Sequence, residues 1–217
     1  WPGRLKVRCR LRRMAGVAAG AKQIELPSDM DEALLKHVRH PWFPRCVDRE
    51  RGGYLSGFTR RWEPEGPQDR VLEFQARQTR SAARLALAYP DDGDLAEYAL
   101  HGFRYLRDVM WDREGGGGWF WLLDADGRPM AGDTKHAHAA SYSVQACALV
   151  YEATGDASAL ELAHEGFAWF ERHGWDEEHG GYHCWFRRDG NVIRGVDELP
   201  DGAPPVDPME HGVGLKD

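Results

Sequence analysis

A three-fold internal repeat is the feature that most constrains the fold of this chain of 217 residues. An aspartate, paired glycines and an aromatic residue recur as Asp48-Arg-Glu-Arg-Gly-Gly-Tyr54, Asp112-Arg-Glu-Gly-Gly-Gly-Gly-Trp119 and Asp176-Glu-Glu-His-Gly-Gly-Tyr182. The aspartates of consecutive copies are 64 residues apart (112 − 48 and 176 − 112). Such a period predicts stacked supersecondary units, in which each unit needs its neighbours to cover its apolar face.

Each copy of the repeat is expected to open a short strand pair. Aromatic and aliphatic residues follow the glycines at 54–58, 119–123 and 182–186. Asp126-Gly127 and Asp189-Gly190 then close the second and third pairs. An Asp-Gly dipeptide suits a tight hairpin, in which both central residues adopt positive φ. We therefore predict three β-hairpins.

A pair of helices is predicted after the first hairpin. The stretch 71–89 is helical by its content of alanine, leucine and arginine. Pro90 and Gly93 break the chain, and Asp94 is expected to cap a second helix.

A second helix pair follows the same plan. Its first helix covers about 137–153 and ends at Gly155, and its second is capped by Asp156 or Ser158. An amphipathic segment from residue 28 to about 40 precedes the first hairpin, which makes five helices in all.

Five helices and three hairpins predict an all-α fold, either an open solenoid or an α/α toroid whose inner helices line a central pocket. No helix pair follows the third hairpin, because the chain ends at Asp217 within a stretch rich in proline and glycine from Pro200 to Gly214. We therefore expect the native sequence to continue beyond Asp217.

Charge is unevenly distributed. Residues 1–22 carry seven basic groups and no acid, which leaves a net charge of −14 (21 − 35) for the remainder. The net negative charge of the remainder, the acidic body, argues against nucleic-acid binding. Residues 1–22, the basic head, have the alternative interpretation of an arm that binds nucleic acid or anionic lipid. The head has few core-forming residues and lacks the apolar run of a signal peptide. We interpret residues 1–27 as a disordered or non-native extension, with Met14 or Met30 as the true start.

Cysteine usage and hydropathy predict the compartment. The four cysteines are widely spaced and form no C-x-x-C pair: Cys9, Cys46, Cys147 and Cys184. This pattern is typical of a reducing cytoplasm. Apolar stretches stay well short of the ~20 residues that a membrane helix needs. We expect a cytoplasmic protein that binds no membrane.

Five motifs stand in a characteristic order: Pro41-Trp-Phe-Pro-Arg-Cys-Val-Asp48 with Gly52-Gly53-Tyr54, then Leu72-Glu-Phe-Gln-Ala-Arg-Gln78, Gly118-Trp-Phe-Trp-Leu-Leu-Asp-Ala-Asp-Gly127, Asp133-Thr-Lys-His136 and Ala153-Thr-Gly-Asp156. Together they resemble the N-acylglucosamine 2-epimerase family, which includes mannose isomerases and cellobiose epimerases. The resemblance covers about residues 30–217. Each motif is modest alone, and their order and spacing make the set specific.

The resemblance implies an (α/α)6 barrel of about twice this length, with residues 28–217 as its N-terminal half. It also implies that a base removes the C2 proton of an open-chain aldose to give a cis-enediolate. An epimerase reprotonates this species at C2 and an isomerase at C1. Histidine acid/base catalysis suits such chemistry near neutral pH. The family's principal pair of histidines follows a segment that looks like His211–Asp217, which argues against activity of this chain alone. No cofactor is implied.

Arg77 and His138 are the candidate catalytic residues. Arg77 matches an arginine that the family keeps on an inner helix, where a guanidinium can polarise a carbonyl or stabilise an enediolate. The alternative is an ion pair with Glu73, one turn earlier. His138 and Tyr142 share a helix face and match positions that contact the sugar ring in relatives, although Tyr or Asn is commoner at the first and His or Phe at the second. Sugar binding is favoured over catalysis for both, and a structural role for His138 has equal weight.

Trp119, Trp121 and His136, with Tyr142, are the candidate substrate-binding residues. The two tryptophans share a strand face, where their rings stack on a sugar or cover the core. His136 precedes His138 by two residues, and such positions point apart on a helix. Because no further cysteine, histidine or carboxylate completes a ligand pattern, no metal site is predicted.

Two other function classes stay open. An (α/α)6-barrel glycoside hydrolase or lyase would need an acid/base pair of carboxylates, but the periodic aspartates of the repeat suggest turn chemistry. A non-catalytic helical-repeat protein would bind a protein partner instead. The partner we expect is a small-molecule sugar, whose identity the sequence does not give. The open flank of an unclosed barrel predicts a homodimer or low stability.

Overall fold

The computed structural model describes residues 28–199 and separates two compact units, residues 1–39 and 40–217. In the first unit, α1 (Ser28–Leu34) continues into the π-helical turn η1 (Leu35–Arg39), as the amphipathic segment predicts. The predicted extension 1–27 and the C-terminal stretches Pro200–Gly214 and His211–Asp217 lie outside the described residues.

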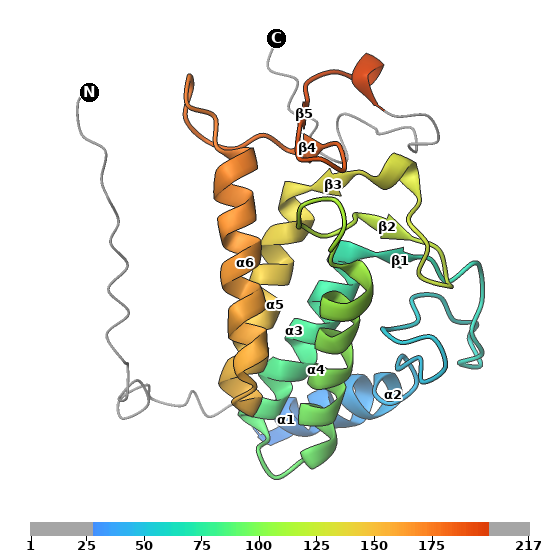
Figure 1. Ribbon diagram of the computed structural model, residues 1–217. Helices are drawn as coiled ribbons and strands as arrows, with labels where there is room; N and C mark the ends of the chain where they lie inside the picture. The colour runs from blue at the N-terminus through green and yellow to red at the C-terminus, as the bar shows by residue number, and fades with distance from the viewer. Residues whose placement is uncertain (1–27, 200–217) are drawn as a thin grey trace, which may run out of the picture. The chain divides into compact units, whose positions relative to one another are not determined.

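Four long helices build the second unit after the short α2 (His40–Trp42). They are α3 (Leu72–Ala88), α4 (Gly93–Tyr105, prolonged by the π-helical turn η2, Leu106–Met110), α5 (Ala137–Thr154) and α6 (Ala157–Gly174). Helix α3 packs against α5, while α4 packs against α3 and α6 against α5 (Figure 1). The helices therefore alternate between an inner pair, α3 and α5, and an outer pair, α4 and α6.

Five short strands lie at the end of this bundle where α3 and α5 begin (Figure 1). Strand β1 (Arg70–Val71) pairs antiparallel with β2 (Leu122–Leu123). Strands β3 (Lys135–His136), β4 (Trp185–Phe186) and β5 (Val192–Ile193) form a second antiparallel sheet in that order. The short 3-10 turns η3 (Ala131–Asp133) and η4 (Val196–Glu198) complete the elements. Because β1 and β3 run directly into α3 and α5, the two sheets fix the first turns of the inner helices.

The predicted hairpin turns are present, but their geometry differs from the prediction. Only the glycines have positive φ, +83° at Gly127 and +87° at Gly190, and Asp126 and Asp189 do not. The loop is longer than a two-residue turn, because the Asp124 N–H donates to the Arg128 carbonyl over 2.9 Å. Loops of this length need only one left-handed residue, which the glycine supplies.

The end of α5 and the start of α6 agree with the sequence prediction, whereas the start of α4 does not. This helix begins at Gly93, so Asp94 lies in its first turn, where it interacts favourably with the helix dipole, rather than at the cap. At α6 the Asp156 carboxylate accepts a hydrogen bond from the Ser158 N–H, which confirms the predicted cap. Gly155 ends α5 in the left-handed conformation, also as predicted.

The three copies of the repeat form the same turn. In each copy the aspartate N–H donates to the carbonyl of the second glycine, and the aspartate carbonyl accepts from the N–H of the first glycine. The glycines involved are Gly53 and Gly52 for Asp48, Gly118 and Gly117 for Asp112, and Gly181 and Gly180 for Asp176. The Oδ1 of each aspartate accepts two further backbone N–H groups within the turn. The interpretation of these aspartates as turn residues is thus confirmed.

Two of the repeat aspartates also bind a buried cation from the strand before the next inner helix. Asp48 pairs with Arg70 of β1, and Asp112 lies 3.1 Å from the Lys135 ammonium of β3. Arg188 adds a second contact to Asp112 at 3.0 Å. Burial alone would raise the pKa of Asp112, but these cations and the turn N–H groups lower it from 3.8 to about 2. The ion pairs therefore tie each turn to the start of α3 or α5.

Small side chains let the inner helices approach closely. Fully buried alanines recur along both helices: Ala76, Ala82 and Ala83 on α3, and Ala139 and Ala146 on α5. Aromatic residues fill the remaining core, as with Phe103 and Trp119. Among the helices of residues 28–199, none is both long and apolar enough to cross a membrane.

Candidate functional site

The first turns of α3 and α5 bring most of the predicted site residues together. Helix α3 carries Glu73 and Arg77, and α5 carries His138 and Tyr142, while His136 is the last residue of β3. Since α3 and α5 pack against each other, these five side chains form one continuous row, which we call the α3–α5 wall.

A hydrogen-bonded Glu73–His136 pair forms the buried end of this wall. The His136 Nδ1 lies 2.7 Å from one Glu73 carboxylate oxygen, and the Trp121 indole N–H donates to the other over 3.2 Å. Burial by itself would raise the pKa of Glu73, yet the hydrogen bond and charge of His136 outweigh it, and the pKa lies below its ordinary value. Glu73 is therefore an ionised carboxylate that orients the His136 ring.

Tryptophans enclose the His136 ring, of which only 3% is exposed. It stacks on Trp185, its partner across the β3–β4 pairing, with ring centroids 4.1 Å apart. Trp121 meets both rings edge-on. The His136 Nε2 and the Trp185 Nε1 are buried and find no hydrogen-bond partner among residues 28–199. Buried polar atoms of this kind are uncommon, and a water or a polar ligand would satisfy them.

The structure overturns one prediction about the histidines. His136 and His138 were expected to point apart on a helix, but α5 begins only at Ala137 and His136 has extended backbone angles (φ −129°, ψ 121°). The change of direction at this junction brings the two rings within 5.9 Å. Reasoning from helical spacing failed because His136 precedes the helix, which begins at Ala137.

Glu73 completes a cluster that the sequence did not reveal. Ligand atoms of Glu73, His136 and His138 all lie within 4.8 Å of one another. Two imidazoles and a carboxylate are a donor set that could hold a divalent cation such as Zn²⁺. The direct His136–Glu73 hydrogen bond accounts for two of the three side chains without an ion, and the absence of a metal stays a prediction. The one sequence signal for the participation of Glu73 in this cluster is its position four residues before Arg77, which places both side chains on one face of α3.

The exposed end of the wall is built around Tyr142. The Arg77 guanidinium donates to the Tyr142 hydroxyl over 3.1 Å and lies 4.4 Å from the centre of its ring. The His138 ring meets the same tyrosine edge-on at 5.0 Å. Arg77 and His138 are both exposed. The alternative ion pair between Arg77 and Glu73 does not form, because Glu73 bonds His136 and Trp121 instead.

The two candidate tryptophans do not share a surface. Trp121 backs the wall, whereas Trp119 is 2% exposed and donates its indole N–H to the Leu106 carbonyl over 3.1 Å. Its ring lies against Gly166 of α6, where an added Cβ would come within 2.2 Å of it. Trp119 forms an isolated antiparallel bridge with Trp111, and the strand β2 begins only at Leu122, so the two tryptophans do not alternate along one strand. Of the two roles left open for Trp119, this position favours the core.

The sequence of this chain is similar to those of known proteins. The sequence profile of the N-acylglucosamine 2-epimerase family matches residues 53–197. The chain belongs to this family. It is 31% identical over 171 residues to a cellobiose 2-epimerase from Bacteroides fragilis, a match that covers 77% of this chain and 42% of the relative. Identity to a D-mannose isomerase from Marinomonas mediterranea is 29% over 154 residues, 70% of this chain and 36% of the relative.

Solved structures confirm the fold class. The cellobiose 2-epimerase from Spirochaeta thermophila superposes with a TM-score of 0.70 at 28% identity, over 76% of this chain and 40% of that protein. A family 76 glycoside hydrolase from a Bacteroides thetaiotaomicron strain, 20% identical, shares the fold with a TM-score of 0.57, over 76% of this chain and 33% of the hydrolase. The all-α, partial (α/α)6 barrel is thereby confirmed for the described residues. The chain spans about two fifths of the length of the curated relatives it matches.

Proposed function

We propose that this chain forms part of the active site of a sugar epimerase or isomerase, which acts at C2 of an open-chain aldose through a cis-enediolate. One observation carries the proposal: in a member of this family, a cation and an imidazole stand exposed at one end of a row whose other end is a buried carboxylate–histidine pair. The row supplies a donor for a developing oxyanion beside an imidazole, the side chain most often used for acid/base catalysis.

Arg77 is assigned to the sugar carbonyl. When a base takes the C2 proton, the electrons of the C2–H bond form the C1–C2 double bond and the carbonyl oxygen becomes an enediolate oxygen. A guanidinium that donates to this oxygen stabilises the charge as it develops. Tyr142 holds Arg77 from one side through its ring and hydroxyl. The guanidinium is thus oriented before the substrate arrives.

His138 is assigned to proton transfer or to a sugar hydroxyl beside Arg77. Its ring contacts Tyr142 on one side and His136 on the other, so its position is fixed while its edge stays exposed. His136 contacts the substrate through Nε2, and Glu73 and Trp121 position it. The remaining acid/base groups come from the second half of the barrel, as the family resemblance implies.

Hydrogen exchange at C2 tests this function. The complete gene product is incubated in heavy water with mannose, N-acetylmannosamine or cellobiose, and the recovered sugars are analysed by NMR. We expect deuterium at C2 of at least one sugar, together with its epimer or ketose. A methyl glycoside of the same sugar, which cannot open to the aldehyde, should take up none. If no sugar acquires deuterium, the proposal is wrong.

A hydrolase function finds less support in this part of the chain. Glycoside hydrolysis needs two carboxylates across a glycosidic bond. The repeat aspartates stand in three separate turns, and each uses its Oδ1 to accept two backbone N–H groups. They stabilise the fold and are not arranged as an acid/base pair.

A further inference from the structure

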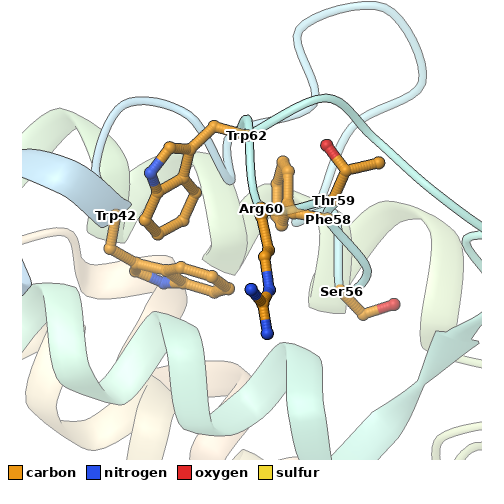
Figure 2. A pocket seen from close by; sticks show the side chains of 6 residues that line it. All are labelled: Trp42, Ser56, Phe58, Thr59, Arg60 and Trp62. Atoms are coloured by element: carbon orange, nitrogen blue, oxygen red, sulfur yellow. The ribbon is translucent and has the colours of Figure 1, made fainter.

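Side chains that can bind a metal ion gather at the α3–α5 wall and not in the hollow of about 550 Å³ that Figure 2 shows. The hollow is lined from α2 and from the loop after the first repeat turn by Trp42, Ser56, Phe58, Thr59, Arg60 and Trp62. These six side chains include no imidazole, thiol or carboxylate, and the positive charge of Arg60 disfavours a cation there. The wall, in contrast, carries two imidazoles and a carboxylate.

Three ligand atoms meet at the wall where β3 runs into α5. Glu73, His136 and His138 offer one atom each, and these atoms lie within 4.8 Å of one another. Two histidines and a glutamate form the ligand set of some zinc sites, in which water or another small molecule takes the fourth position. Two ligands of one tetrahedral Zn²⁺, each roughly 2.0–2.2 Å from it, are about 3.3 Å apart. The widest gap therefore has to close by about 1.5 Å, which the exposed His138 side chain can do by rotating.

The other two ligands are already in contact. His136 Nδ1 lies 2.7 Å from Glu73 Oε1, and the Trp121 indole N–H holds the second carboxylate oxygen. Stacking on Trp185 fixes the plane of the His136 ring. Two of the three ligands are thus positioned before an ion arrives, and the negative charge of the ionised carboxylate favours a cation.

His138 is the ligand that distinguishes this chain. The family resemblance places tyrosine or asparagine more often at this position. Zinc in proteins is bound by cysteine, histidine and carboxylate side chains, so neither of those residues would replace His138 as a ligand. The complete set of three is therefore a feature of this sequence and not of the family's commoner pattern.

Arg77, the cation of the wall, is held away from the ligand set by Tyr142. Its guanidinium lies 4.4 Å from the centre of the Tyr142 ring, and the opposite neighbour of that ring is His138 at 5.0 Å. The order along the wall is thus carboxylate, two imidazoles, tyrosine and guanidinium. Tyr142 separates the negative end of the wall, where a cation would bind, from its positive end.

We infer that Glu73, His136 and His138 bind a divalent transition-metal ion such as Zn²⁺, and that this ion competes with the sugar for the wall. The ion is an inhibitor and not a cofactor. Metal binding itself does not depend on the proposed function. The competition rests on it, because it places the reacting end of the sugar at the same side chains.

The bound ion would occupy the groups that the reaction uses. As the bond between the metal and His136 Nδ1 forms, the Nδ1–H bond breaks and the proton leaves for the solvent. The Glu73 carboxylate then binds the metal in place of that proton. The lone pair of His138 enters a second metal–nitrogen bond, so this imidazole can no longer accept a proton from the sugar. Because binding releases a proton, the ion should bind more weakly as the pH falls.

Cobalt absorption tests the ligand set. The complete gene product, prepared without a histidine tag, is titrated with Co²⁺, whose visible d–d bands report tetrahedral coordination, and Zn²⁺ is then added as competitor. We expect a single strong site per chain, from which Zn²⁺ displaces Co²⁺. His138→Tyr should weaken Zn²⁺ binding at least about 10-fold, since loss of an outer-shell partner already costs about 10–100-fold. Glu73→Gln, which can still accept a hydrogen bond from His136, should have a similar effect.

His179→Ala is the matched control. His179 is an exposed histidine between two carboxylates, with Nδ1 3.3 Å from Asp176 and Nε2 3.8 Å from Glu178. Its loss should leave the cobalt spectrum and the zinc affinity unchanged. The inference is wrong if no d–d bands appear, if His138→Tyr binds Zn²⁺ as tightly as the wild type, or if both variants lose affinity equally. Thermal unfolding without metal checks the fold of each variant, and the exposed His138 should be replaceable at little cost.

Inhibition is measured with a sugar that exchanges its C2 hydrogen. We expect Zn²⁺ to raise the apparent KM while kcat changes little, and a chelator to restore the rate. Faster exchange with Zn²⁺, or inhibition that a high sugar concentration does not relieve, would overturn the competition. If no sugar exchanges, the proposed function and the competition both fail, whereas the cobalt titration still decides whether the three side chains bind metal.

Discussion

Replacing Arg77 with alanine is expected to lower kcat/KM for C2 epimerisation or isomerisation by about 10²–10³-fold, the loss typical of removing one oxyanion donor. In the proposed mechanism the guanidinium donates to the oxygen that becomes negative, and the Tyr142 hydroxyl, to which it is hydrogen-bonded, orients it. Because Arg77 is exposed, its removal should leave the thermal unfolding midpoint nearly unchanged. Initial rates under saturating and dilute substrate measure the effect.

Arg84→Ala is the matched control for Arg77. Arg84 is an exposed arginine on the same helix, nearly two turns further on, and should retain wild-type activity. Arg77→Lys keeps the charge but loses the planar fork of donors, so its activity should fall between wild type and alanine. Equal rates for Arg77→Ala and Arg84→Ala would mean that Arg77 only packs on Tyr142.

Asp112→Asn is expected to destabilise the protein by about 3–5 kcal/mol, the cost of leaving a buried charge unpaired. The Lys135 ammonium is 1% exposed and would lose the carboxylate that lies 3.1 Å away, while it keeps the hydrogen bonds to the Gly117 and Arg188 carbonyls. Lys135 belongs to β3, so the loss should also loosen the start of α5, where His136 lies. Urea unfolding of the wild type and the variant measures the difference.

Asp176→Asn controls for the turn itself. Asp176 makes the same two Oδ1 contacts with backbone N–H groups, but its side chain is 13% exposed and its charged partner is the exposed His179. Its loss should cost no more than about 1 kcal/mol, as for other exposed pairs. Similar losses for both variants would show that the turn, and not the buried ion pair, carries the effect.

At low pH, Asp112 should lose its contribution to the free energy of unfolding. Its folded pKa of about 2 lies below the ordinary 3.8, so the ionised carboxylate stabilises the fold above pH 3.8. That contribution, about 2 kcal/mol, is lost as the pH falls from 3.8 toward 2. The Asp112→Asn variant should lack this part of the pH dependence.

The repeat made the fold predictable from the sequence. Its turns depend on contacts within a few residues, which is why Asp48, Asp112 and Asp176 could be assigned to turns without a structure. The bounds of α3 and α5 and the start of α6 were predicted to within about one residue for the same reason, since Gly155 and Asp156 act locally. Asp94 was placed wrongly because the helix begins one residue earlier, at Gly93, with Asp92 as its N-cap.

The site was only partly predictable, because its contacts join distant segments. Arg77, His138 and Tyr142 were predicted from their family positions and shared helix faces. Glu73 was considered only as an alternative ion-pair partner of Arg77, whereas in the structure it pairs with His136, which is 63 residues away in sequence. Trp185 was missed altogether, since its role arises from strand pairing with β3.

A complex with an open-chain substrate analogue tests most directly whether the α3–α5 wall binds the reacting end of the sugar. The complete gene product is crystallised with the sugar alcohol of the aldose that exchanges its C2 hydrogen. We expect the oxygens at C1 and C2 of the alcohol to lie within hydrogen-bond distance of the Arg77 guanidinium and the His138 ring. An alcohol bound elsewhere in the barrel, with no contact to the first turns of α3 and α5, would contradict it.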